Sequence, residues 1–268
     1  MAATAAEPRI LVHGHRGARA ARPENTMPAF EYAIRAGVDV LELDLAVTKD
    51  DVLVVSHDPV LAESICQGPG PTRVIREMTL EHLRRWDCGS LRNPNFPSQQ
   101  PVPGARVPSL DEVLALAQRS SVDFNIETKI FRDNPQYTPS PEEFAKLVVD
   151  AIRRHKLERR VMIQSFDFRT LHAAEKLVPE IRRVALWEGA ARDFVDLARE
   201  ARATILSPQF RLVNKANVRA AHQAGFQVVP WTANTPSDWD RLVDARVDAI
   251  ITDDPAALIA HLKARGLR

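Results

Sequence analysis

The segment VLELDLAV (residues 40–47) carries two carboxylates within an otherwise apolar run. Glu42 and Asp44 lie two residues apart, so in an extended strand both side chains point to one face while three leucines point to the other. Two carboxylates enclosed in a fold repel each other and lose their hydration unless a cation compensates them. The pattern therefore indicates a cation beside this strand. Two alternatives are an edge strand that faces water and a buried ion network with arginine or lysine.

A third carboxylate, Glu127, stands near the end of a second strand-like run, VDFNIET. Three carboxylates together with water form the oxygen-rich ligand set that Mg²⁺ and Ca²⁺ prefer, and Mn²⁺ accepts such a set as well. We therefore predict one divalent cation held by Glu42, Asp44 and Glu127. Arg16 and Lys129 are the partners that a buried ion network would use instead.

Two histidines, His15 and His57, also follow strand-like runs, in HGHRG and VVSHD. Imidazole titrates near neutral pH, so two histidines beside carboxylates are suited to general acid–base catalysis. Arg16 and Lys129 are suited to an anion, because arginine binds a phosphate with two hydrogen bonds and lysine acts as a point charge. Metal ligands, two histidines and phosphate-binding cations together indicate phosphoryl chemistry. The sequence has no GxSxG motif, and neither cysteine has a spacing typical of a catalytic nucleophile.

These residues follow strand-like segments that alternate with amphipathic helical segments about eight times along the chain. Such alternation is typical of parallel strands joined by crossover helices. About eight units in 268 residues favour an α/β fold of the closed (β/α)8 type, the TIM barrel, whose active site lies at the carboxyl ends of the strands. The expected strands are RILVHG, VDVLELDLAV, VDFNIET, RVMIQSF, RRVALW, ATILS, FQVVPWT and VDAIIT, with DVLVVSH as a further strand-like run, and helices are expected at residues 26–37, 109–119, 141–155, 167–177, 190–200, 214–224, 236–244 and 255–265.

The segment 58–107 breaks this alternation, because it is rich in proline and glycine and is too long for an ordinary loop. We expect it to form a small insertion with one short helix, TLEHLRRW, placed directly after His57 within a single domain that spans residues 1–268. Cys66 and Cys88 lie in this insertion. Their spacing does not match a zinc site, and we interpret them as two free thiols, with a disulfide as the alternative in an oxidising compartment.

Composition and charge exclude several other classes of protein. The chain is 45% hydrophobic and 26% charged with a net charge of +1, and it has no basic stripe of the kind that binds nucleic acid. No apolar run approaches the ~20 residues that span a membrane. The start, MAATAAEPRI, lacks the basic and apolar regions of a signal peptide, which favours a cytoplasmic protein, with a periplasmic location as the alternative if a signal has been removed. No motif indicates an oligomeric state.

Longer motifs carry a resemblance to a known family. The stretch from His15 to Asp58, HRGARAARPENTMPAFEYAIRAGVDVLELDLAVTKDDVLVVSHD, resembles the signature of the glycerophosphodiester phosphodiesterase family. That signature joins an HRG start, a PENT turn, an E-x-D strand and a closing HD. The motifs VPSLDEVL, NIETK, QSFD, PWTANT and TDDP then follow in the order of the family. Each motif is weak alone, but together they are specific and extend over most of the chain.

The resemblance implies a (β/α)8 barrel with a small insertion after the second histidine, and hydrolysis of glycerophosphodiesters to glycerol 3-phosphate and an alcohol. It implies that one histidine removes a proton from the glycerol 2-hydroxyl, which attacks phosphorus, while the other protonates the leaving alkoxide. A cyclic phosphate forms and water then opens it, and which histidine is the base first is left open. The roles implied by position are metal ligands at Glu42, Asp44 and Glu127, acid–base catalysts at His15 and His57, phosphate contacts at Arg16 and Lys129, and a wall of the substrate pocket at Trp231, for which a core aromatic is the alternative.

Three features depart from the family's pattern, and one of them is the long, proline-rich insertion after His57. Asp50-Asp51 stands where the family often has Asp-Gly, and LAESIC stands where an Asp-Arg-Thr element often follows the HD motif. The alcohol is therefore open: small soluble esters such as glycerophosphocholine and glycerophosphoethanolamine are expected first, and lysophospholipids, cleaved in a lysophospholipase D reaction, are the alternative. The expected partner is thus a small-molecule glycerophosphodiester, without nucleic acid or stable membrane insertion. His13, which precedes the HRG motif, is interpreted as structural or as a support to the site.

Overall fold

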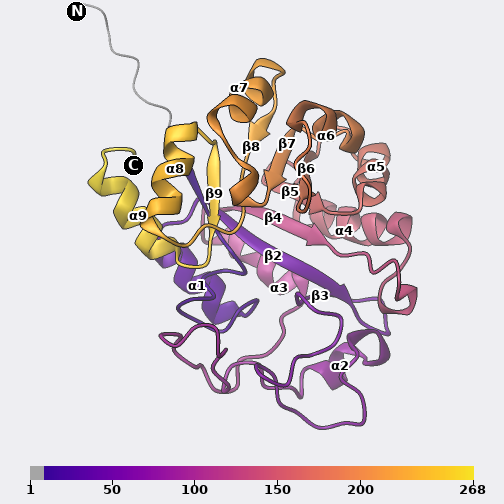
Figure 1. Ribbon diagram of the computed structural model, residues 1–268. Coiled ribbons are helices and arrows are strands. Elements are labelled where there is room, and N and C mark those ends of the chain that lie inside the picture. The colour runs from indigo at the N-terminus through magenta and orange to yellow at the C-terminus, as the bar shows by residue number, and fades with distance from the viewer. Residues whose placement is uncertain (1–8) are drawn as a thin grey trace, which may run out of the picture.

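Eight parallel strands form a nearly closed barrel in the computed structural model, which describes residues 9–268 (Figure 1). The hydrogen-bonded order is β8-β7-β6-β5-β4-β2-β1-β9. Backbone bonds from Asp248 to Val228 and from Ile251 to Pro230 join the two ends of this order. The predicted TIM barrel is therefore confirmed. Its strands are β1 Leu11–Gly14, β2 Val40–Val47, β4 Asp123–Thr128, β5 Val161–Ser165, β6 Arg182–Trp187, β7 Ile205–Pro208, β8 Gln227–Val228 and β9 Ala249–Thr252.

Helices follow the strands and cover the outside of the barrel. Their ends carry ordinary capping signals: Ser140 and Glu143 form a capping box ahead of Pro141, and Gly37 ends the first helix in the left-handed conformation at φ 93°. The α-helices are α1 Met27–Ala36, α2 Leu80–Leu83, α3 Leu110–Leu114, α4 Pro141–His155, α5 Phe168–Leu177, α6 Phe194–Ala201, α7 Lys215–Gln223, α8 Pro236–Ala245 and α9 Pro255–Ala264, with short 3-10 helices η1 Ile75–Glu77, η2 Ala115–Gln118, η3 Pro135–Tyr137 and η4 Phe210–Leu212.

One predicted helix begins later than expected. The sequence suggested a helix from residue 190, but α6 begins at Phe194. Asp193 is its N-cap, because the Asp193 carboxylate accepts a hydrogen bond from the backbone N–H of Asp196 at 3.0 Å. The preceding residues 188–192 form a loop in which Gly189 has a φ of 92°.

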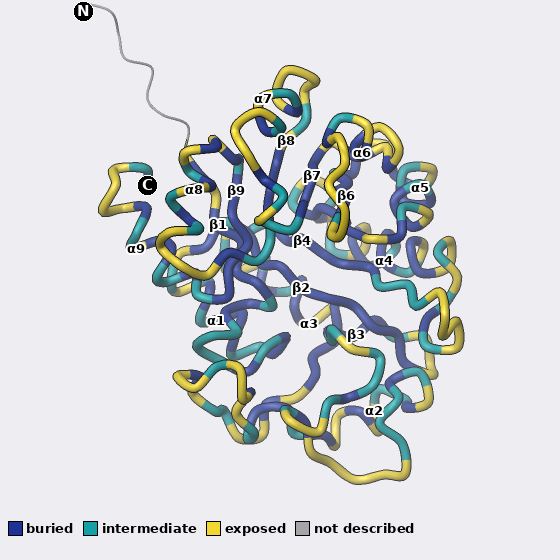
Figure 2. The backbone as a smooth tube through the Cα atoms, in the orientation of Figure 1, coloured by how far each residue is buried: buried dark blue, intermediate teal, exposed yellow. Residues whose placement is uncertain are grey.

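Strand β2 lies inside the barrel wall and is buried along its whole length. It pairs in parallel with β1 and β4, so the interpretation of VLELDLAV as a water-facing edge strand is wrong. The three leucines of this strand belong to the apolar layer between the strands and the helices. A separate apolar cluster, which includes Val40, Met162 and Ile251, fills the barrel interior. Figure 2 shows the buried strands surrounded by helices with exposed outer faces.

The insertion begins after a third strand that is not part of the barrel. β3, Leu53–Val55, pairs antiparallel with the end of β2, and residues 58–107 then form a lobe beside the barrel (Figure 1). This lobe has its own apolar cluster, which includes Leu61, Leu83 and Trp86. The expected short helix within TLEHLRRW is present as α2.

Cys66 and Cys88 form a disulfide in this lobe, with an Sγ–Sγ distance of 2.06 Å. The interpretation of the two cysteines as free thiols is therefore wrong. The physical reason is a long-range pairing: Gln67 and Asp87 exchange two backbone hydrogen bonds at 2.8 Å, which brings the neighbouring cysteines opposite each other. A pairing of two irregular loops has no periodic signal in the sequence.

No helix within residues 9–268 is both long and apolar enough to span a membrane. The N-terminal segment on which the expectation about a signal peptide rested falls largely in residues 1–8, outside the described residues.

Candidate active site

The three predicted metal ligands meet at the carboxyl end of the barrel strands. Glu42 and Asp44 project from β2, and Glu127 projects from β4, where Asp44 and Glu127 are directly paired in the strand register. One carboxylate oxygen from each residue lies within 4.8 Å of the others. All three residues are at most 6% exposed. The alternation in β2 and the register with β4 thus bring three buried carboxylates to one point.

Two cations lie beside these carboxylates. The Lys129 Nζ lies 2.7 Å from Glu127 Oε1 and 3.2 Å from Asp44 Oδ1, and the Arg16 Nε lies 3.3 Å from Asp44 Oδ2. Burial alone would raise the pKa of Asp44, but Lys129 and Arg16 hold it well below its usual value. Burial raises the pKa of Glu42 well above its usual value, and the charge of Asp44 adds to this rise. Burial also raises the pKa of Glu127.

The donor set fits a hard divalent cation. Three carboxylates face only two cations, Arg16 and Lys129. The Arg16 guanidinium is also shared with a further carboxylate, because its Nη1 lies 2.6 Å from Glu24 Oε1. The Asp44 Oδ1 is fully buried and accepts no hydrogen bond, although Lys129 lies at ion-pair distance. A buried carboxylate oxygen without a hydrogen bond is costly, and coordination of a cation removes that cost. An ion network of Arg16 and Lys129 therefore does not by itself satisfy this cluster.

Hydrogen bonds from neighbouring groups orient Glu42. The Gln164 amide donates to Glu42 Oε1 at 2.6 Å, and the backbone N–H of Arg16 donates to Glu42 Oε2 at 2.9 Å. Arg16 has a φ of 49° and Gly17 a φ of 83°, so the HRG turn needs a glycine. A Cβ on Gly17 would lie 2.7 Å from the Ala29 carbonyl carbon, because this turn packs tightly on the start of α1.

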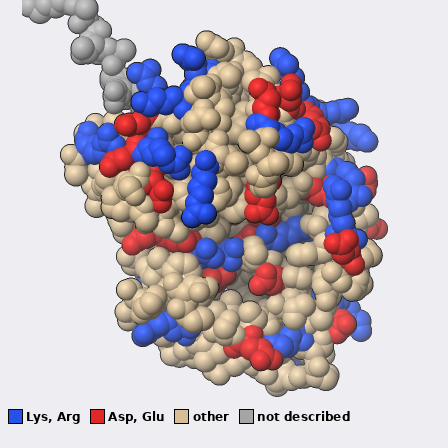
Figure 3. All heavy atoms as spheres, viewed as in Figure 1, with Lys and Arg blue, Asp and Glu red and all other residues tan. Residues whose placement is uncertain are grey.

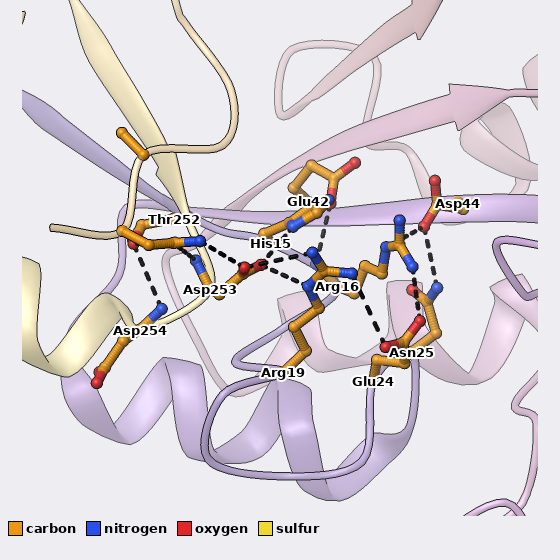
Figure 4. A network of polar contacts seen from close by, with 12 residues as sticks. His15, Arg16, Arg19, Glu24, Asn25, Glu42, Asp44, Thr252, Asp253 and Asp254 are labelled. Atoms are coloured by element: carbon orange, nitrogen blue, oxygen red, sulfur yellow. Dashed lines mark hydrogen bonds and ion pairs between the residues drawn. The ribbon is translucent and has the colours of Figure 1, made fainter. Parts of the chain in front are cut away.

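His15 is held between Glu42 and Asp253 (Figure 4). Its Nδ1 lies 2.6 Å from Asp253 Oδ1, and its Nε2 lies 3.9 Å from Glu42 Oε2. Burial lowers the pKa of His15 to about 4, although Asp253 acts in the opposite direction. Asp253 itself receives hydrogen bonds from Arg19 Nε at 2.5 Å and from Asn234 Nδ2 at 2.7 Å. A carboxylate at Nδ1 keeps the proton there, which leaves Nε2 available to act on a ligand.

His57 reaches the same cavity from the turn after β3. The backbone N–H of Ser56 donates to the carbonyl oxygen of Asp44 at 3.0 Å, which places His57 beside the carboxylate cluster. The His57 Nδ1 lies 2.7 Å from Asp58 Oδ1. This hydrogen bond lowers the pKa of Asp58. The side chains of His57 and Asp58 are 35% and 57% exposed, so the second histidine–carboxylate pair is in contact with water.

A cavity of about 360 Å³ joins these groups. Its walls include Phe166 and Trp231, whose rings meet edge to face with centroids 5.5 Å apart. Trp231 is half-buried at the wall, so its interpretation as a residue of the pocket agrees with its position. Figure 3 shows acidic and basic side chains gathered around a hollow on this face. Of the predicted site residues, all but the deeper Asp44 line the cavity: His15, Arg16, Glu42, His57, Glu127, Lys129 and Trp231.

Several residues of the site had no predicted role. Asp253 pairs with His15 across 238 positions of sequence, and Glu24 pairs with Arg16. Asn25 donates to Asp44 Oδ2 at 3.0 Å, and Gln164 orients Glu42. The TDDP, PENT and QSFD motifs contain all four of these residues and were the available signals. His13, in contrast, lies at the opposite end of the barrel in a cavity with Arg182 and takes no part in this site.

Comparisons with known proteins agree with this arrangement. The profile of the Glycerophosphoryl diester phosphodiesterase family matches residues 15–257. A glycerophosphodiester phosphodiesterase of Caldanaerobacter subterraneus subsp. tengcongensis is 32% identical over 96% of this chain and 100% of its own length. One from Bacillus subtilis is 33% identical over 92% of this chain and 84% of its own.

Solved structures show the same architecture. A structure from Silicibacter pomeroyi, assigned by its name to glycerophosphoryl diester phosphodiesterases, superposes with a TM-score of 0.89 at 29% identity and covers 97% of this chain and 95% of its own. A phosphodiesterase of Oleispira antarctica, solved in complex with the product sn-glycerol-3-phosphate, superposes with a TM-score of 0.81 over 95% of this chain and 97% of its own. At 22% identity the second likeness shows the fold alone.

Proposed function

The chain belongs to the glycerophosphoryl diester phosphodiesterase family, and we propose that it hydrolyses glycerophosphodiesters to glycerol 3-phosphate and an alcohol by metal-dependent, two-histidine catalysis. It is an enzyme, a glycerophosphodiester phosphodiesterase like its full-length relatives. The Oleispira antarctica protein binds sn-glycerol-3-phosphate as its product, and we assign the same product here.

The observation that carries the proposal is the pairing of each histidine with a carboxylate at Nδ1. His15 is paired with Asp253 and His57 with Asp58, and both histidines line one cavity with Arg16 and Lys129. Each histidine can therefore present Nε2 to a ligand as an acceptor when neutral or as a donor when protonated. Acid–base catalysis of phosphodiester cleavage needs one group in each of these forms.

Arg16 and Lys129 are proposed to hold the phosphate. Burial opposes the charge of Lys129, but Glu127 and Asp44 raise its pKa above the usual value, so the ammonium stays charged. Asp44 and Glu24 likewise raise the pKa of Arg16 against the effect of burial. Two charged donors whose side chains are each only 11% exposed give a phosphodiester the positive field it needs.

The reaction needs no nucleophile from the protein. One histidine accepts the proton of the glycerol 2-hydroxyl, whose oxygen forms a bond to phosphorus as the bond to the leaving alkoxide breaks. The other histidine donates its proton to that alkoxide, which leaves as the alcohol. Water then opens the cyclic phosphate with the two histidines in reversed roles, and glycerol 3-phosphate is released. A divalent ion bound by Glu42, Asp44 and Glu127 would neutralise charge on the phosphate and lower the pKa of the attacking hydroxyl.

The test is an assay of glycerol 3-phosphate released from glycerophosphocholine and glycerophosphoethanolamine. The protein is treated with EDTA, and Mg²⁺, Ca²⁺ and Mn²⁺ are then added back separately. We expect activity to be lost with EDTA, to return with at least one ion, and to be lost in Glu42→Ala and His57→Ala. His82→Ala is a matched control, because His82 lies exposed on α2 in the lobe and does not line the cavity.

The outcomes separate the parts of the proposal. Activity that survives both EDTA and Glu42→Ala would show that the three carboxylates form a structural ion network and not a metal site. Loss of activity in His82→Ala to the same degree as in His57→Ala would remove the assignment of the second histidine. Release of lysophosphatidic acid from lysophospholipids, without release of glycerol 3-phosphate from either soluble ester, would show that the substrates are lipids, the alternative raised by the sequence.

A further inference from the structure

One loop of the catalytic site is packed against the lobe. Residues 15–26 join β1 to α1 and carry the first histidine and the arginine of the site, and residues 93–99 of the lobe contact this loop. Gln99 is 1% exposed, and its amide donates to the carbonyl oxygens of Arg19 and Arg22 at 2.6 and 3.2 Å. A buried amide that bonds two carbonyls fixes the two segments relative to each other. The lobe therefore supports the loop from which catalytic side chains project.

A first contact of the lobe reaches Arg16 through Glu24. The Asn93 Nδ2 donates to Glu24 Oε2 at 3.0 Å, and Glu24 Oε1 accepts a hydrogen bond from Arg16 Nη1 at 2.6 Å (Figure 4). The Glu24 side chain is 9% exposed, so water is a poor substitute for a lost donor. Arg19 Nη1 lies 3.9 Å from Glu24 Oε2. Without Asn93, the carboxylate can turn toward Arg19, which weakens its bond to Arg16.

A second contact of the lobe reaches His15 through Arg19 and Asp253. The Arg19 guanidinium lies over the Phe96 ring, with its Cζ 5.0 Å from the ring centroid. Arg19 Nε and Nη2 donate to the two carboxylate oxygens of Asp253 at 2.5 and 3.3 Å, and this carboxylate pairs with His15 (Figure 4). A guanidinium stacked on an aromatic face is restricted in its orientation. Phe96 therefore limits the motion of Arg19, and through it the motion of the carboxylate that orients His15.

We propose that Asn93 and Phe96 are positioning residues of the reaction. Asn93 keeps Arg16 in place to bind the phosphate. Phe96 keeps His15 in place for proton transfer. Neither Asn93 nor Phe96 lines the catalytic cavity, so each acts through a residue of the loop. This inference rests on the proposed function and assigns the lobe a part in it.

The two contacts act on different kinetic constants. Arg16 binds the phosphate in the substrate and in the transition state alike, so a displaced Arg16 raises KM and leaves kcat nearly unchanged. His15 acts in the chemical step, so a displaced His15 lowers kcat. A general loosening of the lobe would not separate the two constants in this way.

Asn93→Asp tests the first contact without removing the local turn. Asn93 Oδ1 accepts a hydrogen bond from the backbone N–H of Asn95 at 3.0 Å, and an aspartate keeps this acceptor. It also places a carboxylate oxygen against Glu24 where a donor was. With the full chain, the supporting ion and glycerophosphocholine, we expect KM to rise about tenfold and kcat to change less than about twofold. Asn95→Asp is the matched control, because it makes the same chemical change on an exposed side chain and should alter neither constant.

Phe96→Leu tests the second contact. Leucine keeps an apolar side chain but removes the ring face beside Arg19. We expect kcat to fall about threefold and KM to change less than about twofold, because one cation–π contact is lost. Phe96→Tyr keeps the ring and should retain the kcat of the wild type. The Tm of every variant is measured beside the kinetics.

Several outcomes would overturn the inference. A KM that Asn93→Asp leaves unchanged, or that Asn95→Asp raises equally, would remove the role of Asn93. If Asn93→Asp does not fold, Asn93→Ser replaces it, because a serine hydroxyl still accepts from the turn but ends one bond short of Nδ2, and the same rise in KM is expected. A kcat that falls as far in Phe96→Tyr as in Phe96→Leu would remove the role of the Phe96 ring.

The pattern across variants distinguishes positioning from loss of structure. Parallel changes of KM and kcat in Asn93→Asp and in Phe96→Leu would overturn the inference and leave the proposed function standing, since the lobe would then act only through stability. Absence of glycerol 3-phosphate from the wild-type reaction would contradict the proposed function itself, and this inference with it.

Discussion

Replacement of Asp253 by asparagine is expected to disable His15 while the fold persists. In the structure Asp253 Oδ1 accepts hydrogen bonds from His15 Nδ1 at 2.6 Å and from Arg19 Nε at 2.5 Å. Its Oδ2 accepts hydrogen bonds from Asn234 Nδ2 at 2.7 Å and from Arg19 Nη2 at 3.3 Å. An asparagine has only one acceptor oxygen, whereas the donors approach both oxygens of the aspartate. In one orientation its amide N–H₂ faces Asn234, and in the other it faces His15. Neither orientation satisfies all the donors.

The magnitude follows from burial. Asp253 is 3% exposed, so water does not replace the lost acceptor, and a buried donor left unpaired costs about 1–3 kcal/mol. If the amide N–H₂ faces His15, the imidazole is held as its other tautomer, with the proton on Nε2, and the acceptor needed for proton abstraction is gone. Loss of a positioned acid or base costs about 10²-fold or more in rate. We therefore expect a fall of about 10²-fold in kcat/KM for Asp253→Asn.

Asp58→Asn is the matched comparison, because it changes the partner of the other histidine in the same way. The Asp58 side chain is 57% exposed, so water can take over its hydrogen bond to His57. We expect a loss of no more than about fivefold. Both variants are assayed with a glycerophosphodiester, and folding is checked by circular dichroism. A fall of less than threefold in Asp253→Asn, or equal falls in both variants, would refute the argument from burial.

The same two variants show which histidine is the base and which is the acid in the first step. A glycerophosphodiester with p-nitrophenol as its alcohol needs little protonation of the leaving group. The variant whose defect shrinks most with this substrate affects the histidine that acts as the acid. If Asp253→Asn remains equally impaired, His15 is the base in the first step.

Three further predictions concern stability. Burial lowers the pKa of His13 from 6.5 to about 3, so between these pH values the unfolded chain binds a proton that the folded chain does not. The free energy of unfolding should therefore fall by up to about 1.4 kcal/mol for each pH unit below pH 6. Urea titrations at several pH values should show that this free energy depends less on pH in His13→Met than in the wild type. The disulfide between Cys66 and Cys88 spans 22 positions and should contribute about 3 kcal/mol to the free energy of unfolding. Dithiothreitol should therefore lower the Tm of the wild type, but it should not change the Tm of a variant in which both cysteines are replaced by serine. Gly17→Ala should lower both activity and Tm more than Gly225→Ala, because both glycines have a positive φ but only Gly17 lacks room for a Cβ; equal effects would show that the packing on α1 is unimportant.

The chemistry of the site was largely present in the sequence, because its main residues follow short local patterns. The two-residue spacing of Glu42 and Asp44 determines that both carboxylates share one face of a strand. The alternation of strands and helices then determines that the residues at strand ends gather at one end of a barrel. Five site residues were predicted from their places at such ends, and all of them line one cavity in the structure: His15, Arg16, His57, Glu127 and Lys129. Their catalytic roles stay predictions until the variants are assayed.

What the tertiary structure alone decided are contacts between segments that are distant in sequence. Asp253 reaches His15 only because β9 closes the barrel beside β1, and the disulfide forms only because two irregular loops pair at Gln67 and Asp87. Three residues of the cavity wall, Phe166, Glu188 and Trp231, come together from the ends of three different strands. A local pattern reports the direction of a side chain relative to its own backbone, whereas these distances depend on barrel closure and loop packing, which no single segment encodes.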